Sequence, residues 1–113
     1  MIEILLPIKP LSVNDAWQGR RFKSPAYRQY ETDIAKILPR AKQPLTGWVN
    51  LFYEVGLPSK SFKLSDTANF EKPLVDILVK AGYIEDDCKI IEITGRKVCK
   101  TDFYVKVWIK SAL

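Results

Sequence analysis

The chain has 113 residues, enough for a modest hydrophobic core, and we expect residues 1–113 to fold as a single domain. Its 18 Lys and Arg residues against 13 Asp and Glu residues give a net charge of +5, which favours a nucleic-acid partner without requiring one. The chain contains no histidine, so a Ser-His-Asp or Cys-His mechanism and a histidine metal site are excluded. Proton transfer would have to use carboxylate, lysine, tyrosine or metal-bound water.

The cysteines and the apolar start of the chain indicate where the protein resides. Cys88 and Cys99 are the only two cysteines and lack CxxC spacing, which is typical of reduced thiols in a cytosolic domain. The apolar segment 1–7 contains Glu3 and is too short to span a membrane. We therefore expect a cytoplasmic protein with no membrane association.

The first half of the chain predicts a strand, a loop, a helix and a second strand. Residues 2–6 are predicted to form a strand, and residues 11–23 a polar, basic loop. Ser24 and Pro25 are a favourable helix start. Residues 48–57 alternate as in a half-buried strand. The predicted helix carries its apolar residues at helical spacing up to Pro39: Tyr27, Tyr30, Ile34, Ile37 and Leu38.

The second half predicts a loop, a helix and two strands. Residues 58–65 are predicted to be a loop, followed by an amphipathic helix over 69–81. Asn69 is the expected N-cap, because it leaves Pro73 in the first turn, and Gly82 is the expected residue after the C-cap. Residues 89–93 and 103–110 are predicted strands, with a bulge or turn at 94–96. The predicted order is β-α-β-α-β-β: an α+β fold with two helices on one face of a small mixed sheet.

Acidic residues flank the second predicted helix: Asp66, Glu71, Glu85, Asp86 and Asp87. On composition alone they are helix caps and a solvated turn, but clustered carboxylates are also what a hard divalent cation requires. The two ends of such a helix lie about 18 Å apart at 1.5 Å per residue. Either residues 83–87 run back beside the helix, or two chains pack antiparallel as a homodimer. Lys72 could contact a phosphate, although its spacing favours an ion pair with Asp76.

Two basic segments are candidates for DNA binding. Arg20, Arg21 and Lys23 alternate with aromatic residues, as in surfaces that bind nucleic acid, although an ordinary basic loop has the same composition. Lys60 and Lys63 could extend a path for phosphates beside the acidic cluster.

The stretch 66–87 resembles the RusA family of Holliday junction resolvases, small nucleases associated with phages and prophages. Its segments DTANFEK (66–72), DIL (76–78), KAGY (80–83) and the closing pair Asp86-Asp87 follow the family pattern in order. The resemblance implies a RusA-like fold, a homodimer and Mg²⁺-dependent cutting of four-way junctions. It implies metal binding by Asp66, Asp86 and Asp87 and an essential Lys72. We also assign Asn14 and Asn69 to DNA contacts.

One position departs from the family pattern. The second aspartate of the Asp-x-Asp motif is replaced by Ala68. Either Glu71 supplies the missing ligand, or the metal retains another water in its place, or catalysis is lost. The sequence therefore leaves open an active endonuclease, a non-catalytic protein that binds branched DNA, and a basic interaction domain whose acids are only caps.

Overall fold

A computed structural model of the chain describes residues 1–18, 22–42 and 45–112, with the side chains of Trp17, Gln18 and Phe22 left out. Arg20 and Arg21, two of the predicted DNA contacts, lie outside these residues. Among the described residues, no helix combines the length and the apolar character that crossing a bilayer requires.

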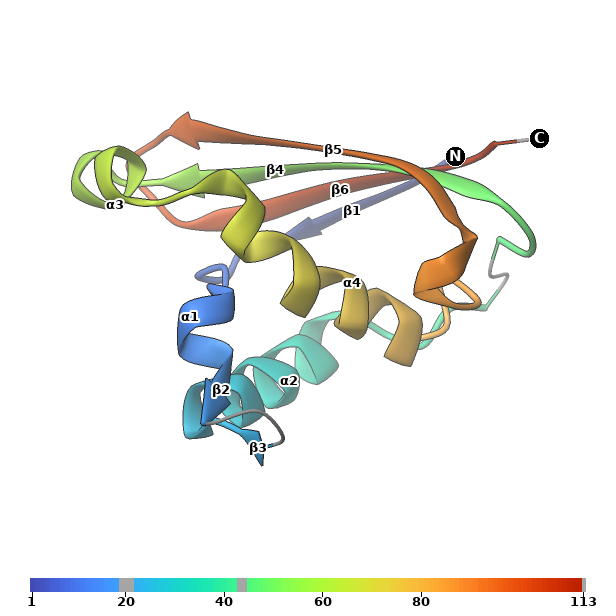
Figure 1. Ribbon diagram of the computed structural model, residues 1–113, viewed down its shortest axis with the longest axis horizontal. Coiled ribbons are helices and arrows are strands. Elements are labelled where there is room, and N and C mark those ends of the chain that lie inside the picture. Colours follow the sequence, from blue (N-terminus) through green and yellow to red (C-terminus); the bar gives the residue numbers. More distant parts are fainter. Residues whose placement is uncertain (19–21, 43–44, 113) are drawn as a thin grey trace.

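A four-stranded mixed sheet forms one layer of the molecule. It contains β1 (Ile2–Leu6), β4 (Val49–Leu57), β5 (Ile90–Cys99) and β6 (Tyr104–Ser111), in the spatial order β1-β6-β4-β5. β4 and β5 pair in parallel, whereas β6 pairs antiparallel with both β1 and β4. The helices α2 (Pro25–Ile37) and α4 (Glu71–Lys80) lie on one face of this sheet (Figure 1). The predicted fold class and order of main elements are therefore confirmed.

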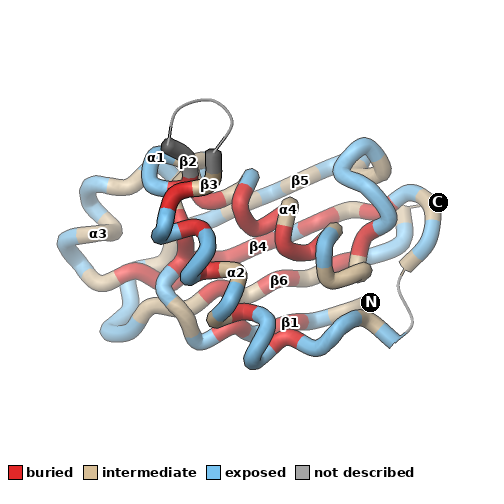
Figure 2. Tube along the Cα trace, turned by 90° about the horizontal axis from the view of Figure 1, so that it is seen from below, coloured by how far each residue is buried: buried red, intermediate tan, exposed pale blue. Residues whose placement is uncertain are grey.

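The core lies between the sheet and these two helices. Alternate residues of β4 and the apolar stripe of α4 face each other there, and Figure 2 shows the buried positions running along both elements. Burial of such side chains is the main stabilising term in a domain of this size. The alternating residues of β4 and most of the predicted apolar stripe of the second helix are confirmed as buried: Val49, Leu51, Tyr53, Val55, Leu57, Phe70, Leu74, Ile77 and Leu78. Ala81, the last residue of that stripe, is the C-cap of α4 and is only half-buried.

The first long helix begins as predicted and ends slightly differently. The Ser24 Oγ accepts a hydrogen bond from the Tyr27 N–H at 3.1 Å, which caps α2. Ile37 was predicted to face the core, but it is 44% exposed. α2 ends at this residue, and Leu38 turns into the core with extended backbone.

The second long helix starts later than the sequence predicts. A 3₁₀ turn, η1 (Thr67–Phe70), precedes α4, and Phe70 is the N-cap. The prediction of Asn69 as N-cap is wrong, because its N–H donates to the Asp66 carbonyl at 3.1 Å inside the 3₁₀ turn. Pro73 still lies in the first turn of α4, and Gly82 follows the C-cap with φ 84°, as predicted.

Both segments predicted as loops contain short regular elements. The first contains α1 (Val13–Ala16) and a hairpin of β2 (Trp17–Gln18) and β3 (Phe22–Lys23). The second contains α3 (Ser59–Leu64). α3 is held by a distant residue, since the Lys97 Nζ on β5 donates to the carbonyls of Phe62 at 2.6 Å and Ser65 at 2.9 Å.

The predicted turn at residues 94–96 is wrong, because β5 continues through it. Gly95 pairs with Tyr53 of β4 in the parallel register. A Cβ on Gly95 would overlap the Tyr53 ring, so the glycine makes room for that ring instead of turning the chain. Lys89, predicted to start this strand, belongs to a short 3₁₀ turn, η2 (Asp87–Lys89).

The open face of the sheet carries a buried carboxylate in a polar network. The Tyr104 hydroxyl donates to Glu54, and the Arg96 Nε donates to Glu54 at 2.7 Å. Beside them, Trp108 is half-buried, with the Lys106 Nζ 5.1 Å and the Arg96 Cζ 6.0 Å from its ring centre. Trp108 is thus partly covered by its basic neighbours.

We expect Glu54→Gln to reduce stability at neutral pH much more than at pH 3. The hydrogen bond from Tyr104 lowers the pKa of Glu54, burial opposes it, and Arg96 adds to the lowering. A lowered folded pKa stabilises the fold above the unfolded value of about 4.3, and this contribution is lost as pH falls through the folded pKa. Urea unfolding should show a loss of about 1–3 kcal/mol at pH 7. The exposed Glu92→Gln is the control, and an equal loss at both pH values would contradict the prediction.

Candidate active site

A pocket of about 330 Å³ lies beside the first half of α4, between this helix and the start of β5. It brings together residues that the sequence places at opposite ends of the helix. Charged and apolar side chains both line it: Ala68, Glu71, Lys72, Val75, Asp76, Asp87, Ile90 and Ile93. Three of the predicted site residues, Glu71, Lys72 and Asp87, thus meet within one chain.

Asp87 reaches this pocket because the chain reverses after α4. The Tyr83 N–H donates to the Leu78 carbonyl at 3.0 Å, and Ile84, buried to 1% exposure, forms a parallel bridge with Leu45. The segment then leads into η2 and β5, whose first residues border the same pocket. Of the two arrangements considered from the sequence, the return of residues 83–87 beside the helix is therefore present in the single chain.

Glu71 is held by a tyrosine from the sheet. The Tyr53 hydroxyl donates to the Glu71 Oε1 at 3.1 Å and lies 3.3 Å from the Thr67 carbonyl oxygen. Burial and the charge of Glu71 raise the pKa of Tyr53, so the phenol remains a donor at neutral pH. Tyr53 and Gly95 therefore position a candidate ligand. The sequence context of Tyr53 predicts only core packing and that of Gly95 predicts a bulge or turn, so neither indicates a role at the site.

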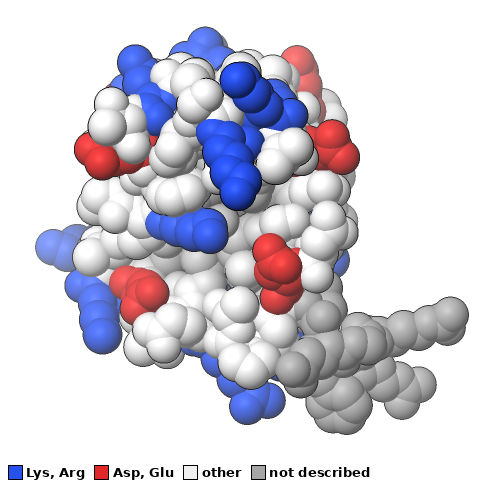
Figure 3. Space-filling model, turned by 90° about the vertical axis from the view of Figure 1, so that its left-hand side faces the viewer, with Lys and Arg blue, Asp and Glu red and all other residues white. Residues whose placement is uncertain are grey.

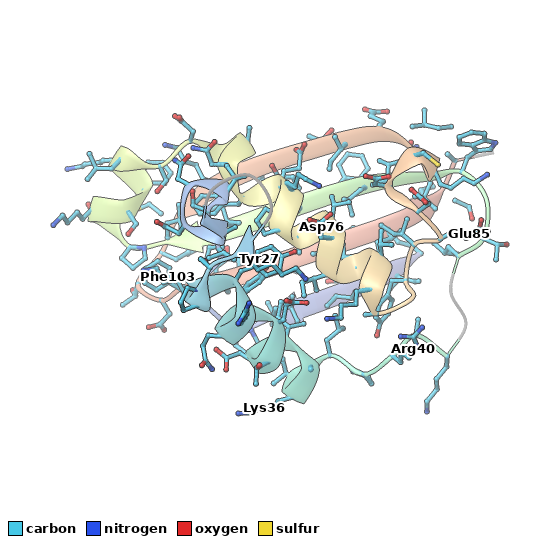
Figure 4. All side chains as sticks on the ribbon, turned by 60° about the horizontal axis from the view of Figure 1, so that its bottom comes forward. Tyr27, Lys36, Arg40, Asp76, Glu85 and Phe103 are labelled. Carbon is cyan, nitrogen blue, oxygen red and sulfur yellow. The ribbon has the colours of Figure 1, made fainter. Side chains whose placement is uncertain are left out.

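Lys72 and Asp76 form the ion pair that their spacing predicts. The Lys72 Nζ lies 3.2 Å from the Asp76 Oδ1, and both residues line the pocket. The Tyr27 hydroxyl of α2 lies 3.4 Å from the Asp76 Oδ2, and Figure 4 shows these two side chains reaching toward each other between α2 and α4. Because the Lys72 side chain is 60% exposed, its charge remains available to a phosphate at the pocket.

The adjacent carboxyl groups of Asp86 and Asp87 affect each other. A hydrogen bond and charge repulsion from Asp86 raise the pKa of Asp87, while Lys72 acts in the opposite direction. The same hydrogen bond and the Cys88 N–H, 3.1 Å from the Asp86 Oδ1, lower the pKa of Asp86. Asp86 therefore caps η2, whereas Asp87 lines the pocket.

The four predicted metal ligands do not form a closed site. Asp66 is exposed at the start of η1 and does not line the pocket. Within the described residues, no three Asp, Glu, Cys or His side chains lie close enough together to hold an ion by themselves. Glu71 and Asp87 share the pocket, which suits Mg²⁺ bound by one or two carboxylates, with waters and a substrate phosphate completing its shell.

The predicted DNA contacts lie on several elements. Asn14 is exposed on α1, and Lys60 and Lys63 are exposed on α3. Asn69 is half-buried in η1. Lys23 is partly engaged, since its Nζ lies 3.0 Å from Glu31. Figure 3 faces the end of the molecule at which α3 lies, and it shows Lys and Arg side chains gathered over the half of that end that carries α3.

Two comparisons with known proteins bear on this site. The family model described as "Endodeoxyribonuclease RusA" matches residues 7–110 of the chain. A search among curated proteins gives no match. The matched range contains the pocket and both segments that form it.

Proposed function

Because the chain belongs to the RusA family of endodeoxyribonucleases, we propose that it is a Mg²⁺-dependent enzyme that cuts Holliday junctions or other branched DNA. The observation that carries this proposal is the pocket shared by Glu71, Lys72 and Asp87. It combines acidic oxygen ligands with an exposed cation, the two components that phosphodiester cleavage requires at a scissile phosphate.

The proposed ion is Mg²⁺, with Mn²⁺ as the alternative. Its proposed ligands are Asp66, Glu71, Asp86 and Asp87, of which Glu71 and Asp87 line the pocket. When bound, the ion supplies a Lewis acid for the phosphate and lowers the pKa of a bound water. Because Mg²⁺ keeps several waters and accepts substrate oxygens, an open site of this kind is sufficient to bind it.

The protein's own side chains orient the proposed metal ligand and neutralise charge on the phosphate. Tyr53 holds one Glu71 oxygen through its hydroxyl, which restricts where that carboxylate points. Lys72 would offset the charge of the scissile phosphate, at the cost of its ion pair with Asp76. Val75, Ile90 and Ile93 form the apolar part of the pocket lining, which makes the surroundings of these charges less polar than bulk water.

The proposed assembly is a homodimer, as the family resemblance implies. Two chains would offer two pockets and therefore paired nicks across a four-way junction.

A non-catalytic junction-binding protein is the second candidate. It is favoured by Ala68, which lines the pocket where the family pattern has a carboxylate.

The test is cleavage of a synthetic four-way junction with Mg²⁺ and with EDTA. The proposal expects nicks near the crossover only with the ion, and stronger binding to the junction than to linear duplex. Junction-selective binding with no cleavage in Mg²⁺ or Mn²⁺ would support the second candidate. Failure to prefer the junction would contradict both.

We expect Lys60→Gln with Lys63→Gln to reduce the salt dependence of junction binding. Both lysines are exposed on α3, and each lost phosphate contact should lower the slope of log K against log salt by about one unit. The matched control is Lys36→Gln with Lys42→Gln, which makes the same charge change elsewhere; Figure 4 shows Lys36 on α2, away from α3. Equal slopes for the two double variants would remove α3 from the DNA surface.

A further inference from the structure

A second and larger pocket, about 610 Å³, opens at the end of the molecule where α1, α2 and α3 meet. Its residues come from the loop after β1, from these helices, from the end of β4, from the segment between α3 and α4 and from the segment before β6. It is separate from the candidate active site, because no residue lines both pockets. The two pockets approach each other only at η1, which contributes Phe70 to this pocket and Ala68 to the other. Its volume is within the range of sites that bind small organic groups.

Tyr30, a tyrosine that lines this pocket, has a hydroxyl without a hydrogen-bond partner among the described residues. Tyr30 is only 6% exposed and lines the pocket, yet no described residue forms a hydrogen bond with its hydroxyl. Among the described side chains, only the Asn50 Oδ1 is both inaccessible to solvent and without a hydrogen-bond partner. Because the Tyr30 hydroxyl also lacks a partner but does not share this property, it must be accessible to solvent. A hydroxyl that reaches the pocket and forms no hydrogen bond to the described residues is free to bond to a ligand or to water there.

The remaining lining defines the ligand's chemistry. Phe70 and Phe103 contribute aromatic surface, and the labelled Phe103 is seen at this end of the molecule in Figure 4. Asp15 and Asp33 also line the pocket, together with Gln29, whose Nε2 donates to the Asp33 Oδ1 at 2.8 Å. The remaining oxygens of the two ionised carboxylates can only accept further hydrogen bonds. A flat aromatic group that carries N–H donors matches this lining, whereas a phosphate would be repelled by the two acids.

Basic residues surround the pocket on its α3 side. Lys9 lies on its rim, with the Nζ 5.4 Å from the Phe103 ring centre, and Ser61, another lining residue, lies between Lys60 and Lys63. Figure 3 faces this end and shows basic side chains above a hollow that has acidic side chains on either side. A DNA backbone crossing the lysines would place its bases within reach of the hollow.

We propose that this pocket binds a nucleobase that carries an exocyclic amine, taken out of the stack of the branched DNA. The Tyr30 hydroxyl and the two carboxylates contact the edge of the base, the phenylalanines contact its face, and the lysines hold the flanking phosphates. Adenine, cytosine and guanine carry such an amine, whereas thymine does not. This inference rests on the proposed function for the source of the base.

The experiment uses the whole protein without divalent ions, so that no DNA is cut. Two-dimensional NMR follows titrations with the monophosphates of adenosine, cytidine, guanosine and thymidine. In parallel, four-way junctions carry single 2-aminopurine bases around the crossover, and their fluorescence reports unstacking. Tyr30→Phe removes the unpaired hydroxyl and keeps the ring. Tyr83→Phe is the control, since its hydroxyl donates to the Pro39 carbonyl at 2.9 Å, away from this pocket.

The expected result is that the three amine-bearing nucleotides shift signals around Tyr30 more strongly than thymidine monophosphate does. At least one 2-aminopurine position should brighten severalfold on binding. Tyr30→Phe should weaken both effects about threefold to tenfold, in line with the loss of one hydrogen bond, while Tyr83→Phe leaves them unchanged. No shifts in the pocket, equal effects in Tyr30→Phe, or a silent 2-aminopurine series on a bound junction would each overturn the inference.

The two proposals fail in different ways. Junction cleavage in Mg²⁺ without any change at this pocket would overturn the nucleobase site and leave the nuclease intact. Nucleotide binding at the pocket without any preference for branched DNA would overturn the nuclease proposal and, with it, the junction as the source of the base.

Discussion

Replacing Asp87 with asparagine should lower junction cleavage at least about 100-fold, because a bound metal ion contributes several kcal/mol to the transition state. Asp87 is the closing acid that lines the pocket with Lys72. Asparagine keeps the size of the side chain but removes its charge, so the ion should be held much more weakly. Since Asp87 is exposed, its replacement should leave the fold and junction binding nearly unchanged. Single-turnover cleavage and gel-shift binding, both with Mg²⁺, measure the two effects.

Asp102→Asn is the matched control, because it removes the same charge from an exposed aspartate in the turn before β6. Cleavage by that variant should remain close to that of the unaltered protein. If Asp87→Asn retained its activity while a similar variant at Asp86 lost it, the ligand would be Asp86. Full activity in both variants would show that the closing acidic pair does not bind the ion.

The main elements could be predicted because their signals are local. The stripe of α4 repeats at helical spacing, and every second residue of β4, from Val49 to Leu57, is apolar. Pro73 and Gly82 then limit where the helix can begin and end. By contrast, α3 depends on Lys97, which is more than thirty residues away in sequence. Such long-range hydrogen bonds leave no periodic pattern in the segment that they stabilise.

The site was only partly predictable for the same reason. The acids and Lys72 could be selected as chemical groups, but the sequence left open whether Asp87 would meet the start of the helix within one chain. That meeting depends on the burial of Ile84 and on the direction of β5. The role of Tyr53 could not be predicted for another reason. Its ring follows the core pattern of β4, whereas its hydroxyl extends from the sheet to Glu71 on α4. A strand residue can thus be both core and site, and alternation predicts only the first role.

The family pattern has an aspartate at the position of Ala68, and Glu71 is the residue that could replace this carboxylate. Both line it, so a carboxylate at either position would face the same space. Glu71 is additionally held by the Tyr53 hydroxyl, which is how a protein orients an acidic ligand before the ion arrives. The geometry therefore favours Glu71 as the residue that supplies the missing carboxylate.

Under this interpretation, Glu71→Gln should lower cleavage about 100-fold or more, for the same reason as the loss of the Asp87 carboxylate. Glutamine still accepts the hydrogen bond from Tyr53, so the unfolding midpoint should change little. Ala68→Asp alone should keep or raise the activity, and in the Glu71→Gln background it should restore a large part of the loss. Single-turnover rates at several Mg²⁺ concentrations distinguish weaker ion binding from slower chemistry. An active Glu71→Gln variant would exclude Glu71 as a ligand, and a fully inactive protein that gains cleavage only through Ala68→Asp would identify a site that has lost catalysis.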